Sequence, residues 1–155
     1  MSPINPNICI FGTHHAYQYK TKRRGYFQNV KSLIQIHSVD VVAEEATGVA
    51  TYAEAIADEA KVLWKNVDLT SEERKHVPDL NPCSIGTQID FDLHSLRERV
   101  WVIRTAKTMK HSALLICGFT HTTGVASKFL SVGFDVETHV YLDGADNELI
   151  ENRIE

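Results

Sequence analysis

Apolar residues follow two different rhythms along this chain. Short continuous apolar runs are typical of buried strands, and they occur at 7–12, 39–44, 113–119 and 135–142. Elsewhere apolar positions recur every three or four residues, which predicts helices at 26–38, 51–61, 91–110 and 124–132. Residues 62–69 could continue the preceding helix or form a strand, and we favour a short strand ending at Asp68.

The segment 91–110 has the strongest helical pattern. We expect its buried stripe to consist of Leu93, Leu96, Val100 and Ile103. Residues 70–90 before it are polar and contain prolines and glycine, so they predict a long loop, a short helix or a lid.

Alternation of strands and helices is typical of βαβ units with a mainly parallel sheet covered on both faces. The expected fold is therefore a small three-layer α/β/α domain over residues 1–142, with a mainly parallel four- or five-stranded sheet. Residues 143–155 form an acidic tail that could add a final helix.

Composition fits one globular domain: the chain has 155 residues, of which 43% are hydrophobic and 23% charged. No apolar run approaches the ~18 residues of a membrane span, and no secretory signal is evident, so we expect a cytoplasmic protein that does not enter a membrane. The net charge of −4 lies in the acidic tail, so nucleic acid is not an expected partner. The three cysteines suit a reducing compartment, with Cys9 and Cys117 buried as free thiols.

Polar residues are concentrated where the predicted strands end. Two of these ends have the same motif, Gly-x-x-His, in the segments 12–15 and 118–121. The other two carry Glu44-Glu45 and Asp68. Ligands of open parallel sheets usually bind at the carboxyl ends of the strands. We therefore predict one shared site at this edge, built on His15, His121 and a glutamate.

Each residue type in that site has a physical role. Glycine lets a ligand approach the backbone, and a helix N-terminus after the strand favours negative charge. Glu44 and Glu45 should point to opposite sides of the strand, and Glu44 is the slight favourite to enter the site. The predicted substrate contacts are Gly12, His14, Tyr17, Gln18, Asp68, Gly118, Thr120 and Thr122.

Basic residues offer two further features. Arg97 on the long helix could reach the strand ends and bind an anion or orient a glutamate, or it could lie on a solvated face. The run 20–24 could attract an anion towards His15, or simply be solvated. No convergent partners are evident for His37, His76, His94, His111 and His139.

These motifs, in this order, resemble the TraB, Tiki, ChaN and erythromycin-esterase superfamily. The chain is most similar to small bacterial proteins with paired Gly-x-x-His motifs, a His-x-Tyr-Gln segment such as 15–18 and an Arg-Glu-Arg-x-Trp segment such as 97–101. The resemblance spans roughly residues 7–142. It implies an α/β hydrolase, either a metal-dependent peptidase or a metal-free esterase, with His15, Glu44 or Glu45, Arg97 and His121 as the functional set.

We therefore expect a hydrolase that activates water on a small ester, peptide or phosphoester substrate, which could be anionic. A divalent metal, Mn or Zn, would be held by His15, His121 and Glu44 if one is used. The alternative is a non-catalytic binding module for an anionic small molecule such as a nucleotide. The sequence leaves the oligomeric state open, a homodimer included.

Overall fold

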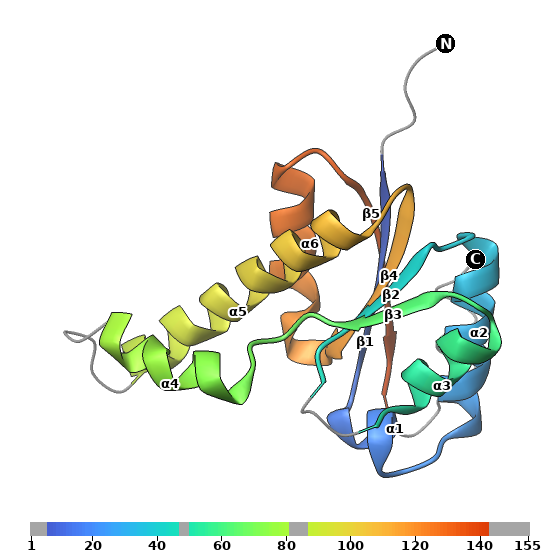
Figure 1. The fold of residues 1–155 in the computed structure, drawn as a ribbon, viewed down its shortest axis with the longest axis horizontal. Helices are drawn as coiled ribbons and strands as arrows, with labels where there is room; N and C mark the ends of the chain where they lie inside the picture. The colour runs from blue at the N-terminus through green and yellow to red at the C-terminus, as the bar shows by residue number, and fades with distance from the viewer. Residues whose placement is uncertain (1–5, 47–49, 81–86, 143–155) are drawn as a thin grey trace.

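Residues 6–46, 50–80 and 87–142 are described by a computed structural model of the chain, drawn in Figure 1. Strands and helices alternate along these residues. In chain order they are β1 (Asn7–Thr13), α1 (His15–Tyr19), α2 (Arg24–Ile36), β2 (Val41–Glu44), α3 (Tyr52–Glu59), β3 (Leu63–Asn66), α4 (Ser71–Leu80), α5 (Thr87–Thr108), β4 (Ser112–Gly118), the 3-10 turn η1 (Phe119–His121), α6 (Thr122–Ser131) and β5 (Asp135–Tyr141).

All five strands are parallel, and they form one sheet in the order β3-β2-β4-β1-β5. The expected small α/β domain with a parallel sheet is thus confirmed, and the segment after α3 does form a strand. β4 lies between β1 and β2, and Thr13 at the end of β1 is paired with Gly118 at the end of β4. Segments more than a hundred residues apart therefore end side by side.

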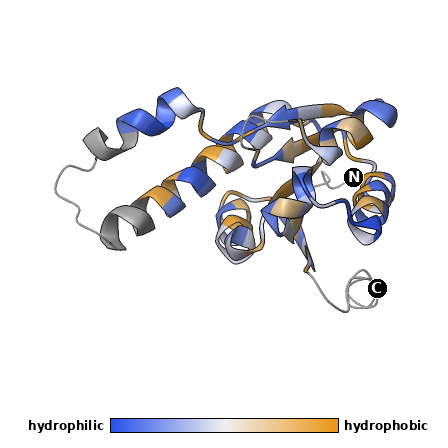
Figure 2. Ribbon diagram, turned by 90° about the horizontal axis from the view of Figure 1, so that it is seen from below, coloured by the Kyte–Doolittle hydropathy of each residue, from blue (hydrophilic) through white to orange (hydrophobic). Residues whose placement is uncertain are grey.

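The helices cover the sheet on two faces. In Figure 1, α2 and α3 lie on one side of the sheet, and α5 and α6 lie on the other. Each face has its own apolar core: Phe11, Tyr26 and Leu33 are buried on the first, and Ile10, Trp101 and Phe129 on the second. Figure 2 shows hydrophilic and hydrophobic residues side by side along the described helices, as expected of amphipathic helices that cover a sheet.

Local contacts explain where some elements begin. The Thr51 hydroxyl accepts a hydrogen bond of 3.1 Å from the Glu54 backbone N–H, which caps α3. The Asp40 carboxylate accepts hydrogen bonds from the N–H groups of Lys110, His111 and Ser112, and so aligns the start of β4 with β2. Burial would raise the pKa of Asp40, but these donors hold it below its usual value.

The prediction that Ile103 belongs to the buried face of α5 is wrong, because this residue is 54% exposed. The buried positions in this part of α5 are Glu98, Trp101, Val102 and Thr105. The buried face of α5 is thus rotated from the expected one by about 100°, which is the rotation that one residue contributes to an α-helix. The large Trp101 side chain and its polar contacts at the sheet edge set this rotation, which apolar spacing does not reveal.

Residues 71–80 form the helix α4, which is one of the alternatives predicted for 70–90, whereas α5 begins at Thr87, before the predicted 91. The short helix α1 was not predicted, because five residues are too few to show a period. The acidic tail 143–155 lies outside the described residues. Within the described part of the chain, no helix is long and apolar enough to cross a membrane.

Candidate functional site

The two Gly-x-x-His segments interlock at the carboxyl edge of the sheet. A Cβ atom on Gly12 would lie 2.3 Å from Thr122 Oγ1 and 3.0 Å from Phe119 Cα, in the turn after β4. A Cβ atom on Gly118 would lie 2.9 Å from Nε2 of His15, in the turn after β1. Each glycine therefore leaves the space that the other segment occupies, which is the physical reason for a glycine at both positions.

His15 begins α1 and lies at the rim of this edge, with 47% of its side chain exposed. Its Nδ1 is 2.7 Å from Gln18 Oε1, and its Nε2 is 3.7 Å from Glu45 Oε2. The buried Gln18 donates in turn to Glu44 Oε2 at 2.8 Å and to the Glu45 carbonyl at 2.9 Å. Gln18 therefore connects α1 to the end of β2.

Glu44 and Glu45 point to opposite sides, as the sequence predicts, and they have different partners. Glu44 is fully buried and accepts hydrogen bonds from Thr51 Oγ1 at 2.6 Å, Trp64 Nε1 at 2.8 Å and Gln18. Burial raises the pKa of Glu44, although these hydrogen bonds oppose the shift. Glu45 instead accepts from the Gly118 N–H at 2.9 Å and from Arg97. Glu45 is therefore the glutamate that meets Arg97 and the end of β4.

Asp68 lies at the centre of a charged network. Its carboxylate accepts from Arg97 Nε at 3.2 Å and Nη2 at 3.0 Å, from Trp101 Nε1 at 2.8 Å and from Arg74 Nη2 at 2.5 Å. Burial would raise the pKa of Asp68, but Arg97 and Trp101 hold it below its usual value. Arg97 thus joins two carboxylates, Asp68 and Glu45, and is not on a solvated face.

His121 has a different environment from His15. Only 5% of its side chain is exposed, and its Nδ1 is 2.8 Å from Glu98 Oε2 on α5. The other Glu98 oxygen accepts from Lys128 Nζ at 2.9 Å. The Trp101 ring contacts the His121 ring edge-on, with centroids 4.6 Å apart, so one tryptophan joins the Asp68 network to this pair. Burial lowers the pKa of His121, although Glu98 opposes the shift.

Sequence reasoning did not assign Glu98, His94 or Lys128 to the site. His94 stacks on His121 with ring centroids 3.8 Å apart, and its Nε2 is 3.2 Å from Glu98 Oε2. The spacing of His94 and Glu98, four residues apart on one helix, was a usable signal, because residues at this spacing share a face. The partner from α6, Lys128, has no such signal in the sequence.

The remaining predicted residues mostly pack or cap. The His14 ring contacts Tyr17 and Phe119, the buried Tyr17 packs against Tyr141, and the Thr122 hydroxyl donates to the Phe119 carbonyl. Thr120 is exposed at the same edge. From the basic run, Lys22 and Arg23 lie over the rings of Phe27 and Tyr17, respectively. Cys9 and Cys117 are buried free thiols, as the sequence predicts.

Two groups of metal-ligating side chains occur in the described residues, and neither is the expected set of His15, His121 and Glu44. One consists of His94, Glu98 and His121, and the other of Cys9, His37, Glu137 and His139. Within each group one ligand atom per residue lies within 4.8 Å of all the others. The expectation that His37, His94 and His139 lack convergent partners is therefore wrong, because tertiary packing supplies those partners.

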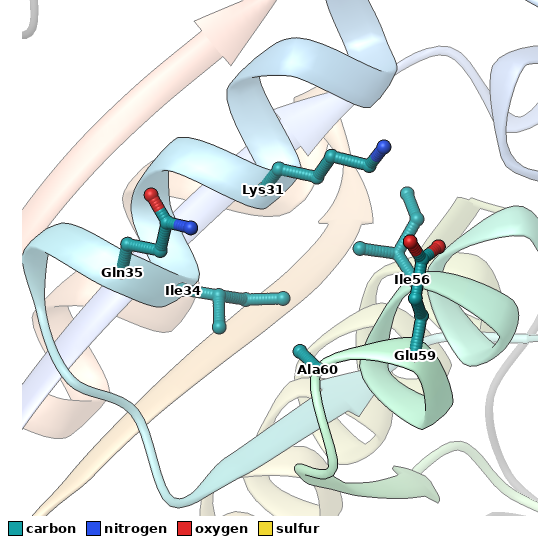
Figure 3. Close-up of a pocket in the computed structure, with 6 residues that line it drawn as sticks. All are labelled: Lys31, Ile34, Gln35, Ile56, Glu59 and Ala60. Carbon is teal, nitrogen blue, oxygen red and sulfur yellow. The ribbon is translucent and has the colours of Figure 1, made fainter.

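A surface pocket of about 240 Å³ lies between α2 and α3, away from this edge. Figure 3 shows Ile34 and Ile56 from the two helices, with Lys31 and Glu59 beside them. The six residues that line the pocket, all labelled in Figure 3, include neither a histidine nor a member of the networks described above. This pocket therefore adds no group to the chemistry of the strand ends.

Comparison of the chain with protein-family models, with curated proteins and with solved structures found no match in any of the three. The functional argument therefore rests on the geometry of these residues.

Proposed function

We propose that this chain is a hydrolase in which Glu98 and His121 form the base that activates water. The observation that carries the proposal is the buried contact of 2.8 Å between His121 Nδ1 and Glu98 Oε2. A carboxylate at one ring nitrogen sets the tautomer of a histidine and leaves the other nitrogen to accept a proton. Because the pKa of His121 is lowered, its imidazole is unprotonated near pH 7 and can accept a proton.

In this mechanism His121 Nε2 removes a proton from water as the oxygen attacks an ester, peptide or phosphoester centre. The same nitrogen then returns the proton to the leaving group. Helix α6 begins at Thr122, directly after His121, and the partial positive charge at a helix N-terminus favours the negative charge that develops on the substrate.

Arg97 and Glu45 act as positioning residues in this proposal. Arg97 is already paired with two carboxylates, so it is a poor candidate for binding a substrate anion directly. Glu45 accepts from the N–H of Gly118, and His121 follows three residues later. The pair thereby holds the end of β4 from which the base emerges, while His15 lies beside Glu45 at the rim.

A divalent metal is compatible with the donors of this site, since two histidines and a carboxylate are a common catalytic zinc set. His94, Glu98 and His121 would hold the ion, which would lower the pKa of a bound water. However, the two imidazole rings are stacked 3.8 Å apart at an interplanar angle of 17°, so their nitrogen lone pairs lie in two separate, nearly parallel planes. His94 would have to turn to bind the same ion, and we therefore favour the metal-free base.

The TraB, Tiki, ChaN and erythromycin-esterase superfamily, which the sequence resembles, includes hydrolases. Membership of this chain in that superfamily is part of the proposal. The test is hydrolysis of an ester, peptide and phosphoester panel by chelator-treated protein, with and without added Mn²⁺ or Zn²⁺. We expect turnover without metal, and a loss of about 10²-fold or more in both Glu98→Gln and His121→Ala.

The double variant should lose little more than either single variant, because the two residues act as a unit. His76→Ala, which alters an exposed histidine of α4, is the matched control and should retain full activity. Full activity in both site variants would exclude the base. If the wild type turns over no substrate but binds an anionic one, the binding-module alternative replaces the hydrolase.

A further inference from the structure

The second group of residues that could hold a metal lies at the outer strands β1 and β5 of the sheet and not at the carboxyl edge. Cys9 is in β1, Glu137 and His139 are in the edge strand β5, and His37 is the residue at which α2 ends. Cys9 is paired with Glu137 in the parallel ladder, and Phe11 with His139. We name these four residues the β5 cluster.

Glu137 is the point at which the β5 cluster converges. Its Oε2 lies 2.7 Å from His37 Nε2 and 2.8 Å from His139 Nε2. Cys9 and His139 are 0% and 1% exposed, and the His37 side chain is 12% exposed. Two imidazoles and a thiol are thus gathered at a nearly buried place beside a half-exposed carboxylate, and buried polar groups are costly unless they are hydrogen-bonded, paired or bound to a metal.

Hydrogen bonding within the described residues satisfies these groups only in part. His139 Nε2 is hydrogen-bonded to Glu137 Oε2 at 2.8 Å, whereas His139 Nδ1 is buried and has no hydrogen-bond partner among the described residues. His37 Nε2, despite its short distance to Glu137, is also buried without a well-aligned hydrogen bond. The other ring nitrogen of His37 is 3.1 Å from the side-chain amide of Asn7. A metal-ligating histidine donates its other ring N–H to an acceptor, and Asn7 offers that acceptor once its amide is turned so that Oδ1 faces His37 Nδ1.

We propose that the β5 cluster is a structural zinc site in which Cys9 Sγ, His37 Nε2, Glu137 Oε2 and His139 Nε2 are the four ligands. Sulfur, nitrogen and carboxylate oxygen are the ligand types that zinc prefers, and four protein ligands make a closed tetrahedral site. The Cys9 thiol gives up its proton on binding. The thiolate and carboxylate then balance the ion's double charge, so the buried site is neutral.

Zinc bonds of about 2.0–2.3 Å place the ligands of a tetrahedral site roughly 3.3–3.7 Å apart. One ligand atom of each residue lies within 4.8 Å of the others, but Glu137 Oε2 is closer than this spacing to both imidazoles, at 2.7 and 2.8 Å. Zinc binding therefore requires movements of about an ångström, with Glu137 moving away from the two rings. Glu137, whose side chain is 50% exposed, and His37, at a helix end, are free to make them. The ion would join α2 to the edge strand β5, which in the described part of the chain pairs with β1 alone.

The site is independent of the proposed hydrolase, because it shares no residue with Glu98, His121 or Arg97. Its test uses the full chain, stripped of metal by a chelator and then titrated with Zn²⁺ against a coloured competing chelator. Co²⁺ replaces zinc in a parallel titration, because a cobalt–thiolate bond gives a charge-transfer absorption that reports a cysteine ligand. Thermal melts are recorded with and without zinc.

We expect one equivalent of zinc and the cobalt–thiolate absorption. At a free zinc concentration one hundred times the Kd, the melting temperature should rise by roughly 5–10 °C. Cys9→Ala should abolish the cobalt–thiolate band, and Glu137→Gln, which preserves shape at a half-exposed position, should weaken zinc binding at least tenfold. Cys117→Ala is the matched control for another buried thiol, and it should retain the band.

The metal-free melt of each variant shows whether it folds, and Glu137→Gln keeps the test valid if Cys9→Ala does not. Absence of zinc binding in the wild type would overturn the proposal. So would binding that survives Glu137→Gln and is lost in His94→Ala, because the ion would then occupy the group on α5. The first result would leave the metal-free base untouched, whereas the second would place an ion on Glu98 and His121 and so favour the metal-dependent form of the hydrolase.

Discussion

The segments Gly12–His15 and Gly118–His121 share the Gly-x-x-His motif and lie at the ends of two adjacent parallel strands. They nevertheless place their histidines in opposite environments. His15 is half-exposed on a short helix and contacts the neutral amide of Gln18. His121 is buried between Glu98 and Trp101. The same motif thus presents one histidine to solvent at the rim and holds the other against a carboxylate.

This difference shows that the motif supplies the turn, while the packed helices supply the chemistry. β4 is followed directly by a 3-10 turn and α6, against which α5 packs with its Glu98 side chain. After β1 the corresponding place is occupied by α1, whose Gln18 reaches the end of β2. Only the second histidine has an acidic partner close enough to set its tautomer.

The largest expected effect separates the two histidines by activity. His121→Ala should lower kcat/KM by about 10²–10⁴-fold, the usual contribution of a general base. His15→Ala should lower it less than about tenfold, because His15 has no carboxylate hydrogen bond and lies at the rim. Both are measured on the best substrate of the panel. Equal losses would contradict the division of roles between the two segments.

The next effect concerns the glycines of the two segments. Gly12→Ala should lower the free energy of unfolding by about 2–3 kcal/mol, since the new Cβ meets the backbone of Phe119 and the buried Thr122. Gly118→Ala should cost less than about 1 kcal/mol, because it meets the end of the half-exposed His15 side chain, which can move away.

Urea unfolding of the two alanine variants measures both values. A larger loss in Gly118→Ala than in Gly12→Ala would show that the segments do not interlock as described.

A smaller effect is expected for the arginine that supports the second segment. Arg97→Lys should cost about 1–2 kcal/mol, because lysine keeps the charge but cannot bridge Glu45 and Asp68 with a planar fork. Arg99→Lys, an exposed position on the same helix, is the control and should leave stability unchanged. Urea unfolding compares them, and equal midpoints for both variants would remove Arg97 from the positioning network.

The smallest effect is a dependence of stability on pH that arises from His121. Its pKa in the folded chain is below the model-peptide value of 6.5, so the unfolded chain binds the proton more readily. The contribution of His121 to stability is therefore complete above about pH 6.5 and is lost as the pH falls through the folded pKa. NMR titration of the ring, with His121→Gln as the control in urea unfolding, measures it. A ring that titrates above 6.5 would reverse the sign.

Some of these features were predictable from the sequence, and others were not. The apolar run at Asn7–Gly12 and the helical period of α2 identified the elements of a parallel α/β sheet within a few residues. The sequence placed Glu44-Glu45 at a strand end, but it did not show that Glu45, and not Glu44, contacts Arg97 and Gly118. One residue of extended chain changes which face a side chain occupies, and nothing local marks where β2 ends. The β5 cluster was missed because its residues lie in three segments that are far apart in the sequence: β1, the end of α2, and β5.

The sequence by itself determined that strands and helices alternate, and hence that strand ends with Gly-x-x-His would meet at one edge. This follows from physics that acts locally: apolar runs become buried parallel strands, and parallel strands end on the same side. Only the tertiary structure decided the partners. The order β3-β2-β4-β1-β5 and the rotation of α5 bring Glu98 to His121, and the ladder with β5 brings Cys9 to Glu137. Such pairings depend on how whole elements pack, because burial of large side chains such as Trp101 sets the rotation of a helix.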